Sequence, residues 1–201
     1  MSSTLPAMCL FALVGAITPG PVNVLALRHG ARAPRTTALL YVLGASASYA
    51  AVVWLMGRSA RLLLQELPWL STAAQWLGAA YLLWLAWRLA RAPATATDTG
   101  GQSQARWLQA FVQGAGVQAL NPKAWLVALA GVGLFVLPQA EAGQALLRFC
   151  AVSLLACLIG VGAWALLGQW LARWLRTPGR QQAFQRLLAL LLAFSVAGML
   201  A

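Results

Sequence analysis

Long apolar segments separated by short polar stretches dominate the chain. A membrane-spanning helix needs about 20 mostly apolar residues, and the segments that satisfy this length are 5–27, 38–60, 67–87, 108–136, 145–171 and 183–201. The pattern predicts an all-α membrane protein with six transmembrane helices. We expect a single transmembrane domain over residues 1–201.

Two proline-containing motifs interrupt this pattern. TPGPVN (18–23) lies within the first apolar segment, and NPK (121–123) lies within the fourth. Each proline lacks a backbone donor and clashes with the carbonyl four residues earlier. Because an unsatisfied carbonyl is costly in lipid, these breaks must face protein, water or a ligand.

The residues at each break also indicate where a helix restarts. Asn121 before Pro122 suits a helix cap followed by proline at the first helical position. Thr18 with Pro19, or Gly20 with Pro21, suits the same arrangement. Each restarted helix would present free amides and a partial positive charge, which attract a carboxylate.

Lys123 follows the second break directly and is the only lysine in the chain. A lysine in the first turn opposes the helix dipole, and an ionised lysine within a membrane is costly. A bound anion would offset both penalties. The alternative, which the sequence leaves open, is that Lys123 extends its ammonium to the membrane interface from a shallow position.

The breaks occupy corresponding places, in the first span of each three-span half. The halves are approximately residues 1–92 and 105–201, joined by the polar loop 93–104. An odd number of spans per half gives the halves opposite orientations, so we expect two inverted three-helix repeats with interrupted first helices. Such matched interruptions point to the central site of a transporter. Prolines that merely kink membrane helices are the alternative.

Composition supports the membrane interpretation, since 61% of the residues are hydrophobic and 8% are charged. The net charge of +11 does not indicate nucleic-acid binding, because the basic residues lie in short clusters between apolar segments. Ten of them flank the odd-numbered loops: Arg28, Arg32, Arg35, Arg88, Arg91, Arg106, Arg173, Arg176, Arg180 and Arg186. Only Arg58, Arg61 and Arg148 flank the even-numbered loops. Odd-numbered loops are therefore expected in the cytoplasm and both termini outside.

Residues for enzymatic or metal chemistry are scarce. The three acidic residues lie near predicted loops, the one histidine is isolated, and the three cysteines have no metal-site spacing. We interpret the cysteines as packing residues, and we expect no catalytic residue, no metal site and no cofactor. No phosphate-binding loop accompanies Lys123, which favours secondary transport over ATP hydrolysis.

Three blocks of the sequence carry a family resemblance. GAITPGPVNVLALRHGAR (15–32), LGAAYLLWLAWRLAR (77–91) and FVQGAGVQALNPKAW (111–125) resemble the recurring blocks of the LysE/RhtB amino-acid exporters. The resemblance implies export of amino acids or close derivatives across the inner membrane. By motif position it nominates the following substrate-binding residues: Thr18, Pro19, Gly20, Pro21, Asn23, Asn121, Pro122 and Lys123.

The second apolar segment departs from the family pattern. Exporters of lysine and arginine in this family tend to carry an acid there, whereas this chain has GASASYAAV (44–52). A neutral, homoserine- or threonine-like amino acid is therefore favoured, and Ser46 and Tyr49 are candidate partners for it. Export of a metal ion or another small metabolite remains an alternative, as does a non-transporting membrane scaffold or subunit. The expected partners are an amino acid and the lipid bilayer, and so small a transporter also suits a homodimer.

Overall fold

The computed structural model describes residues 4–65, 104–175 and 177–200, together with residues 76, 79–80, 83–88 and 90–91. Every regular element in these ranges is an α-helix. The helices with complete bounds are α1 (Thr4–Ile17), α2 (Pro21–Arg32), α3 (Arg35–Gln65), α5 (Gln104–Ala119), α6 (Pro122–Phe135), α7 (Ala142–Ala172) and α8 (Pro178–Leu200). The span expected at 67–87 and the polar loop expected at 93–104 lie largely outside the described residues.

Both predicted interruptions are present. The first apolar segment is divided into α1 and α2, which meet at an angle of 65°. The fourth is divided into α5 and α6 at residues 120–121. Each divided pair is followed by a helix of 31 residues, α3 in one case and α7 in the other. The same succession of elements therefore occurs twice along the chain.

Two described helices are long and apolar enough to cross a bilayer. They are α3, over Arg35–Ser59, and α7, over Ala142–Ala172. The bent pair of α1 and α2 forms a third candidate span, and α6 is a shorter apolar helix. The expected spans at 38–60 and 145–171 thus correspond to single helices that begin a few residues earlier than predicted.

Glycines allow the long helices to approach the divided ones closely. A Cβ atom at Gly30 of α2 would collide with the backbone of α7, and one at Gly168 of α7 would collide with the backbone of α2. A Cβ atom at Gly44 of α3 would likewise collide with the backbone of α5, and one at Gly114 of α5 would collide with the backbone of α3. Small residues at such contacts are typical of helix packing in membranes. These contacts hold the divided helices against α3 and α7.

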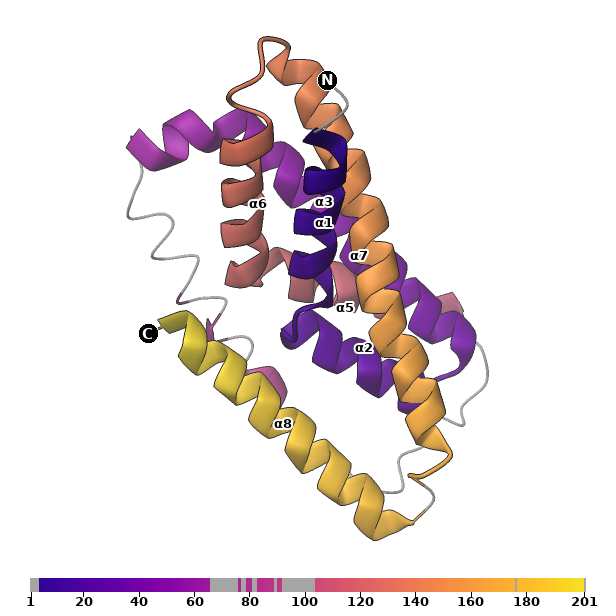
Figure 1. Cartoon of the computed structure of the whole chain (residues 1–201). Coiled ribbons are helices and arrows are strands. Elements are labelled where there is room, and N and C mark those ends of the chain that lie inside the picture. Colours follow the sequence, from indigo (N-terminus) through magenta and orange to yellow (C-terminus); the bar gives the residue numbers. More distant parts are fainter. Residues whose placement is uncertain are drawn as a thin grey trace.

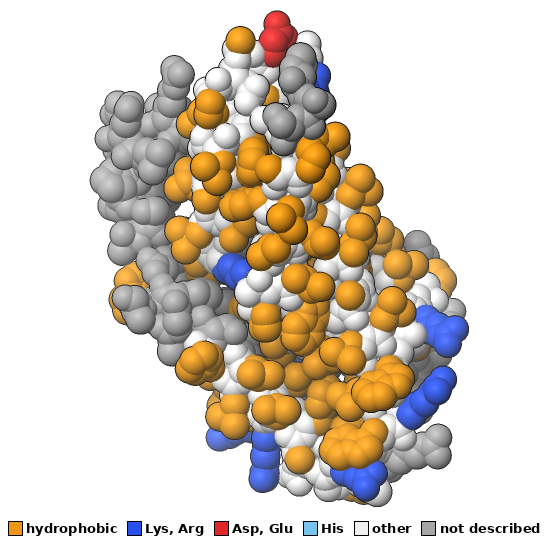
Figure 2. Space-filling view, viewed as in Figure 1, with side chains coloured by type: hydrophobic (Ala, Val, Ile, Leu, Met, Phe, Trp, Pro, Cys, Tyr) orange, Lys and Arg blue, Asp and Glu red, His pale blue; other side chains and the backbone are white. Residues whose placement is uncertain are grey.

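The surface of the described helices is strongly apolar. Leu10, Leu126 and Ile159 are 65%, 62% and 63% exposed, and hydrophobic side chains cover most of the face in Figure 2. Most of the Lys and Arg side chains visible there gather toward the lower end, where α7 ends and α8 begins (Figure 1). An apolar surface this extensive would be unusual for a soluble monomer and suits a lipid environment.

Candidate functional site

The two helix breaks meet in space although they are far apart in the sequence. Helices α1 and α6 lie side by side (Figure 1). The Lys123 ammonium, in the first turn of α6, donates a hydrogen bond of 2.7 Å to the carbonyl oxygen of Thr18, directly after α1. A cation is favourable at this end of α1 because the helix dipole is negative there. Lys123 therefore links one break to the other.

Side chains satisfy the carbonyls that the first break exposes. The Asn23 amide donates to the oxygens of Ala16 and Thr18, at 3.0 and 2.8 Å. The indole N–H of Trp164, on α7, donates to the Ile17 oxygen at 3.0 Å. The sequence indicates that Pro21 frees the Ile17 carbonyl, and the structure gives this carbonyl a partner from a distant helix. Such partners allow α1 to end within an apolar region.

The backbone N–H groups at the start of α2 have fewer hydrogen-bond partners. Gly20 is the cap residue, with extended backbone angles of −172° and 176°, and it has no side chain to cap the helix. Pro21 occupies the first helical position, so the Gly20–Pro21 alternative describes this start correctly. No acceptor within the described part of the chain bonds the backbone N–H groups of Val22 and Asn23. These amides form an electropositive helix end.

The start of α6 is capped by its own residues. The Asn121 side chain accepts a hydrogen bond of 3.2 Å from the Lys123 amide, and Pro122 is at the first helical position. The Asn121 carbonyl accepts from the Ala124 amide at 2.9 Å. The Gln118 carbonyl, which Pro122 frees, accepts from the Asn121 amide at 3.2 Å. The predicted cap at Asn121 and Pro122 is thus confirmed.

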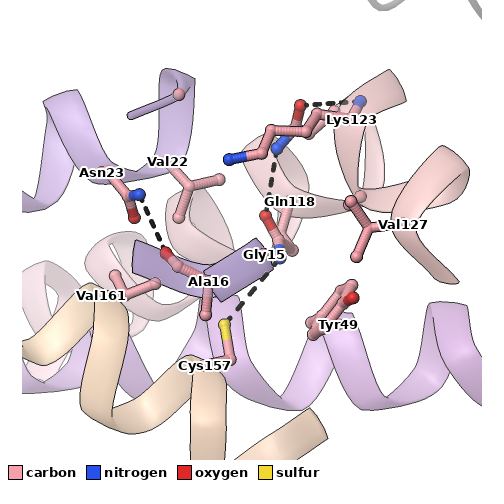
Figure 3. A pocket seen from close by; sticks show the side chains of 13 residues that line it. Gly15, Ala16, Val22, Asn23, Tyr49, Gln118, Lys123, Val127, Cys157 and Val161 are labelled. Atoms are coloured by element: carbon pink, nitrogen blue, oxygen red, sulfur yellow. Dashed lines mark hydrogen bonds between the residues drawn. The ribbon is translucent and has the colours of Figure 1, made fainter. Parts of the chain in front are cut away.

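A pocket lies where the two breaks meet and has an empty volume of about 380 Å³, its open side included. Helices α1, α2, α3, α5, α6 and α7, with the two cap residues, provide its walls (Figure 3). Its apolar and small lining residues are Gly15, Ala16, Gly20, Val22, Ala124, Val127 and Val161. Its polar lining residues are Asn23, Tyr49, Gln118, Asn121, Lys123 and Cys157. The pocket combines an apolar wall with a few polar groups, as small-molecule sites do.

The structure brings half of the nominated residues together around this pocket. They are Gly20, Asn23, Tyr49, Asn121 and Lys123. Pro19, Pro21 and Pro122 shape the breaks and do not line the pocket. Thr18 contributes its carbonyl to Lys123, while its hydroxyl donates to the Val14 oxygen within α1.

Ser46 is fully buried in α3 and also lies outside the pocket lining. Its hydroxyl makes no hydrogen bond to a described residue. Ser46 thus shares a helix with Tyr49 but does not line the pocket.

Sequence reasoning missed Gln118 and Cys157 as pocket residues. The Gln118 amide accepts from the Asn121 side chain at 3.4 Å and donates to the Cys157 sulfur at 3.9 Å. A buried amide within an apolar segment was an available signal, because polar groups inside membranes usually have a partner or a function. Cys157 gave no such signal, since a cysteine in an apolar helix usually packs like a small hydrophobic residue.

The lining of the pocket contains no acidic residue. Glu141, the acidic residue in the described part of the chain, is the cap residue of α7 and does not line the pocket. No group of three His, Cys, Asp or Glu side chains able to hold a metal ion occurs among the described residues. The site therefore offers hydrogen-bond donors, one cation and an apolar wall.

Broken apolar helices that meet at a polar pocket define this chain as an integral membrane protein of the transporter class. Comparison with protein families agrees, because the model of the LysE type translocators matches residues 13–201. The chain belongs to this family, as its sequence motifs predicted.

Its relatives include efflux proteins of enteric bacteria. A cysteine/O-acetylserine efflux protein of Salmonella typhimurium is 34% identical over 193 residues, which cover 94% of each chain. The protein of the same description from Escherichia coli K12 is 34% identical over 197 residues, with the same coverage. No solved structure matches the chain.

Proposed function

We propose that this protein exports a small, neutral amino acid from the cytoplasm, and that the pocket between the two helix breaks binds it. Cysteine, O-acetylserine, homoserine and threonine are of suitable size and charge. The relatives' descriptions support the first two, and the absence of an acid from 44–52 supports the neutral class. The observation that carries the proposal is the convergence of Lys123 and the uncapped start of α2 on one pocket.

The substrate carboxylate is assigned to this electropositive end of the pocket. The Val22 and Asn23 amides are available there, and a Cβ atom on Gly20 would lie 3.7 Å from the Lys123 nitrogen. A carboxylate oxygen beside Gly20 can therefore reach both the helix end and the ammonium. Charge-assisted hydrogen bonds of this kind are about twice as strong as neutral ones.

Binding of the carboxylate would change the contact between the breaks. Lys123 now donates to the Thr18 oxygen, which also accepts from Asn23. When Lys123 turns to a substrate carboxylate, the Thr18 oxygen keeps its bond to Asn23. The exchange therefore leaves no carbonyl of this break unsatisfied, which keeps its energetic cost low.

A cationic amino acid fits this pocket poorly. Its side chain would enter a site that already holds the Lys123 ammonium and has no carboxylate in its lining. A buried cation without a partner is strongly disfavoured. The same argument weighs against a metal ion as cargo.

The proposed architecture has six spans in two inverted halves. The repeated succession of a divided helix pair and a 31-residue helix supports it, with α8 as the last span of the second half. Basic residues concentrated at the odd-numbered loops support cytoplasmic loops there, both termini outside, and insertion in the inner membrane. A homodimer stays a prediction.

Efflux from dipeptide-loaded cells tests the proposal. Cells that contain the protein should release the neutral amino acid of the dipeptide faster than cells without it, and should release lysine at the background rate. Unchanged release of every amino acid would contradict export as the function.

Replacement of Lys123 by Met tests the carboxylate assignment. Loss of a hydrogen bond to a charged group costs about 1.5–3 kcal/mol, so efflux at low substrate should fall roughly tenfold to 100-fold. Lys123→Arg retains the charge and should keep part of the activity. Wild-type efflux by Lys123→Met, at equal membrane abundance, would remove Lys123 from the site.

A further inference from the structure

The pocket has a second polar side, which the carboxylate assignment leaves without a role. Gln118, Tyr49 and Cys157 line this side, from α5, α3 and α7. They are 6%, 4% and 2% exposed. In Figure 3, Lys123 lies above Gln118, while Cys157 and Tyr49 lie below it. A bound amino acid with its carboxylate at Lys123 would direct its side chain toward these residues.

The Gln118 side chain has a defined orientation because a chain of hydrogen bonds begins at a backbone amide. The Lys123 amide can only donate, so the Asn121 side-chain atom that it contacts, at 3.2 Å, must be the oxygen. The Asn121 nitrogen then faces Gln118 at 3.4 Å, and the Gln118 atom that accepts must be its oxygen. The Gln118 nitrogen consequently points toward Cys157 as a donor (Figure 3).

The hydrogen-bond partner that the protein itself provides for this donor is weak. The Cys157 sulfur lies 3.9 Å from the Gln118 nitrogen, and a thiol is a poor acceptor. The amide is therefore only partly satisfied, although it is almost fully buried. A stronger acceptor in the pocket would improve its hydrogen bonding without displacing any other partner of Gln118.

Tyr49 offers a second group on the same side. Its side chain is buried and lines the pocket. A phenol both donates and accepts hydrogen bonds, so Tyr49 can pair with either a donor or an acceptor on the ligand. Gln118, whose nitrogen can only donate, therefore determines that the ligand must offer an acceptor.

We infer that Gln118 is a specificity-determining residue, which donates a hydrogen bond to an acceptor atom in the substrate side chain. The preferred class is a neutral amino acid with a hydroxyl or ester oxygen near the end of a short side chain. An ammonium side chain has no acceptor, and an alkyl side chain leaves the amide with only the Cys157 sulfur. The inference rests on the proposed function, because it requires an amino acid in the pocket.

Counterflow into proteoliposomes containing the full-length protein tests the inference with a pair of similar substrates. Homoserine ends in a hydroxyl where norvaline ends in a methyl group. One neutral hydrogen bond should make homoserine preferred by roughly 3-fold to 10-fold. Equal transport of the two by the wild-type protein would overturn the role of Gln118, whereas transport of neither would overturn amino-acid export itself.

Variants then assign the preference to one side chain. Gln118→Met removes the donor at similar length, and the ratio of homoserine to norvaline transport should fall to about one while norvaline transport persists. Gln113→Met is the matched control on the same helix, because Gln113 contacts His29 outside the pocket. It should keep the wild-type ratio.

Cys157→Ala removes the competing sulfur and leaves the Gln118 donor in place. Its ratio should equal or exceed that of the wild-type protein. Because each ratio is measured within one protein, differences in expression do not affect it. Loss of the preference in Cys157→Ala, with retention in Gln118→Met, would transfer the recognition to Cys157 and overturn the inference.

Discussion

The two helix breaks satisfy their exposed backbone groups in different ways. At the second break, the cap residue Asn121 bonds the Lys123 amide within the next turn. At the first break, the cap residue Gly20 offers no side chain, and the partners include Trp164, from a helix more than 100 residues away in the sequence. One break is stabilised locally, and the other depends on the assembled bundle.

This difference explains why the pocket is electropositive on the side of the first break. Amides that a local cap has already bonded are unavailable to a ligand, as at the start of α6. The start of α2 keeps the Val22 and Asn23 amides without an acceptor from the described residues. We therefore propose the carboxylate site where the chain leaves backbone amides without an acceptor.

The largest effect is expected from supplying the first break with an acidic cap. In Gly20→Asp, the new carboxylate would bond the start of α2 and pair with Lys123, as a tethered substitute for the substrate. Efflux should fall roughly tenfold to 100-fold, while the free energy of unfolding rises by about 1–2 kcal/mol. Transport assays and thermal unfolding in detergent measure the two changes.

Gly20→Asn is the matched control, because it adds a cap of the same shape without charge. An Asn cap in place of Gly stabilises a helix by only a few tenths of a kcal/mol, and efflux should fall less than in Gly20→Asp. The backbone angles of Gly20 are extended, so both side chains are sterically admissible. An active Gly20→Asp protein would contradict carboxylate binding beside Gly20.

The next largest effect is a loss of stability. It should be greater when the first break loses a side-chain partner than when the second break does. Asn23→Ala removes the amide from the Ala16 and Thr18 carbonyls, of which only Thr18 keeps another donor. We expect a loss of about 2–3 kcal/mol in the free energy of unfolding. Asn121→Ala removes a helix cap and should cost about 1 kcal/mol.

Thermal unfolding of the two variants in the same detergent gives this comparison directly. If Asn121→Ala proved the more destabilising, the first break would not be the one that relies more on its side-chain partner.

The smallest effect is expected at Thr18, despite its place in the TPGPVN motif. Its hydroxyl bonds back to the Val14 oxygen, and the site uses only its backbone carbonyl. Thr18→Val should therefore change the free energy of unfolding by no more than about 0.5 kcal/mol, as most substitutions away from key contacts do. Efflux should stay near the wild-type rate, and a severe transport defect would instead assign the hydroxyl to the substrate.

Much of the fold could be predicted because the responsible rules are local. Proline chemistry placed both breaks and the cap at Asn121. Apolar segment length located the helices that became α3 and α7 within a few residues. Their ends were less predictable, since helical residues continue beyond the apolar segment wherever polar side chains tolerate the helix.

The site was only partly predictable. Motif position nominated Lys123 and Asn23, which line the pocket, whereas Ser46, proposed from the second apolar segment, is fully buried and does not line it. Ser46 and Tyr49 are three residues apart and neighbours on one helix face, so the sequence could not separate them. Gln118 entered the pocket because the chain of hydrogen bonds from Asn121 orients its side chain.

The sequence by itself determined that this protein belongs in a membrane and the positions at which its helices break. These properties follow from segment composition and from the covalent structure of proline, which act within a few residues. Only the tertiary structure decided that Lys123 bonds Thr18, 105 residues away, and that Gln118 faces Cys157. Such contacts depend on how the divided helices pack against α3 and α7, and no local rule specifies that packing.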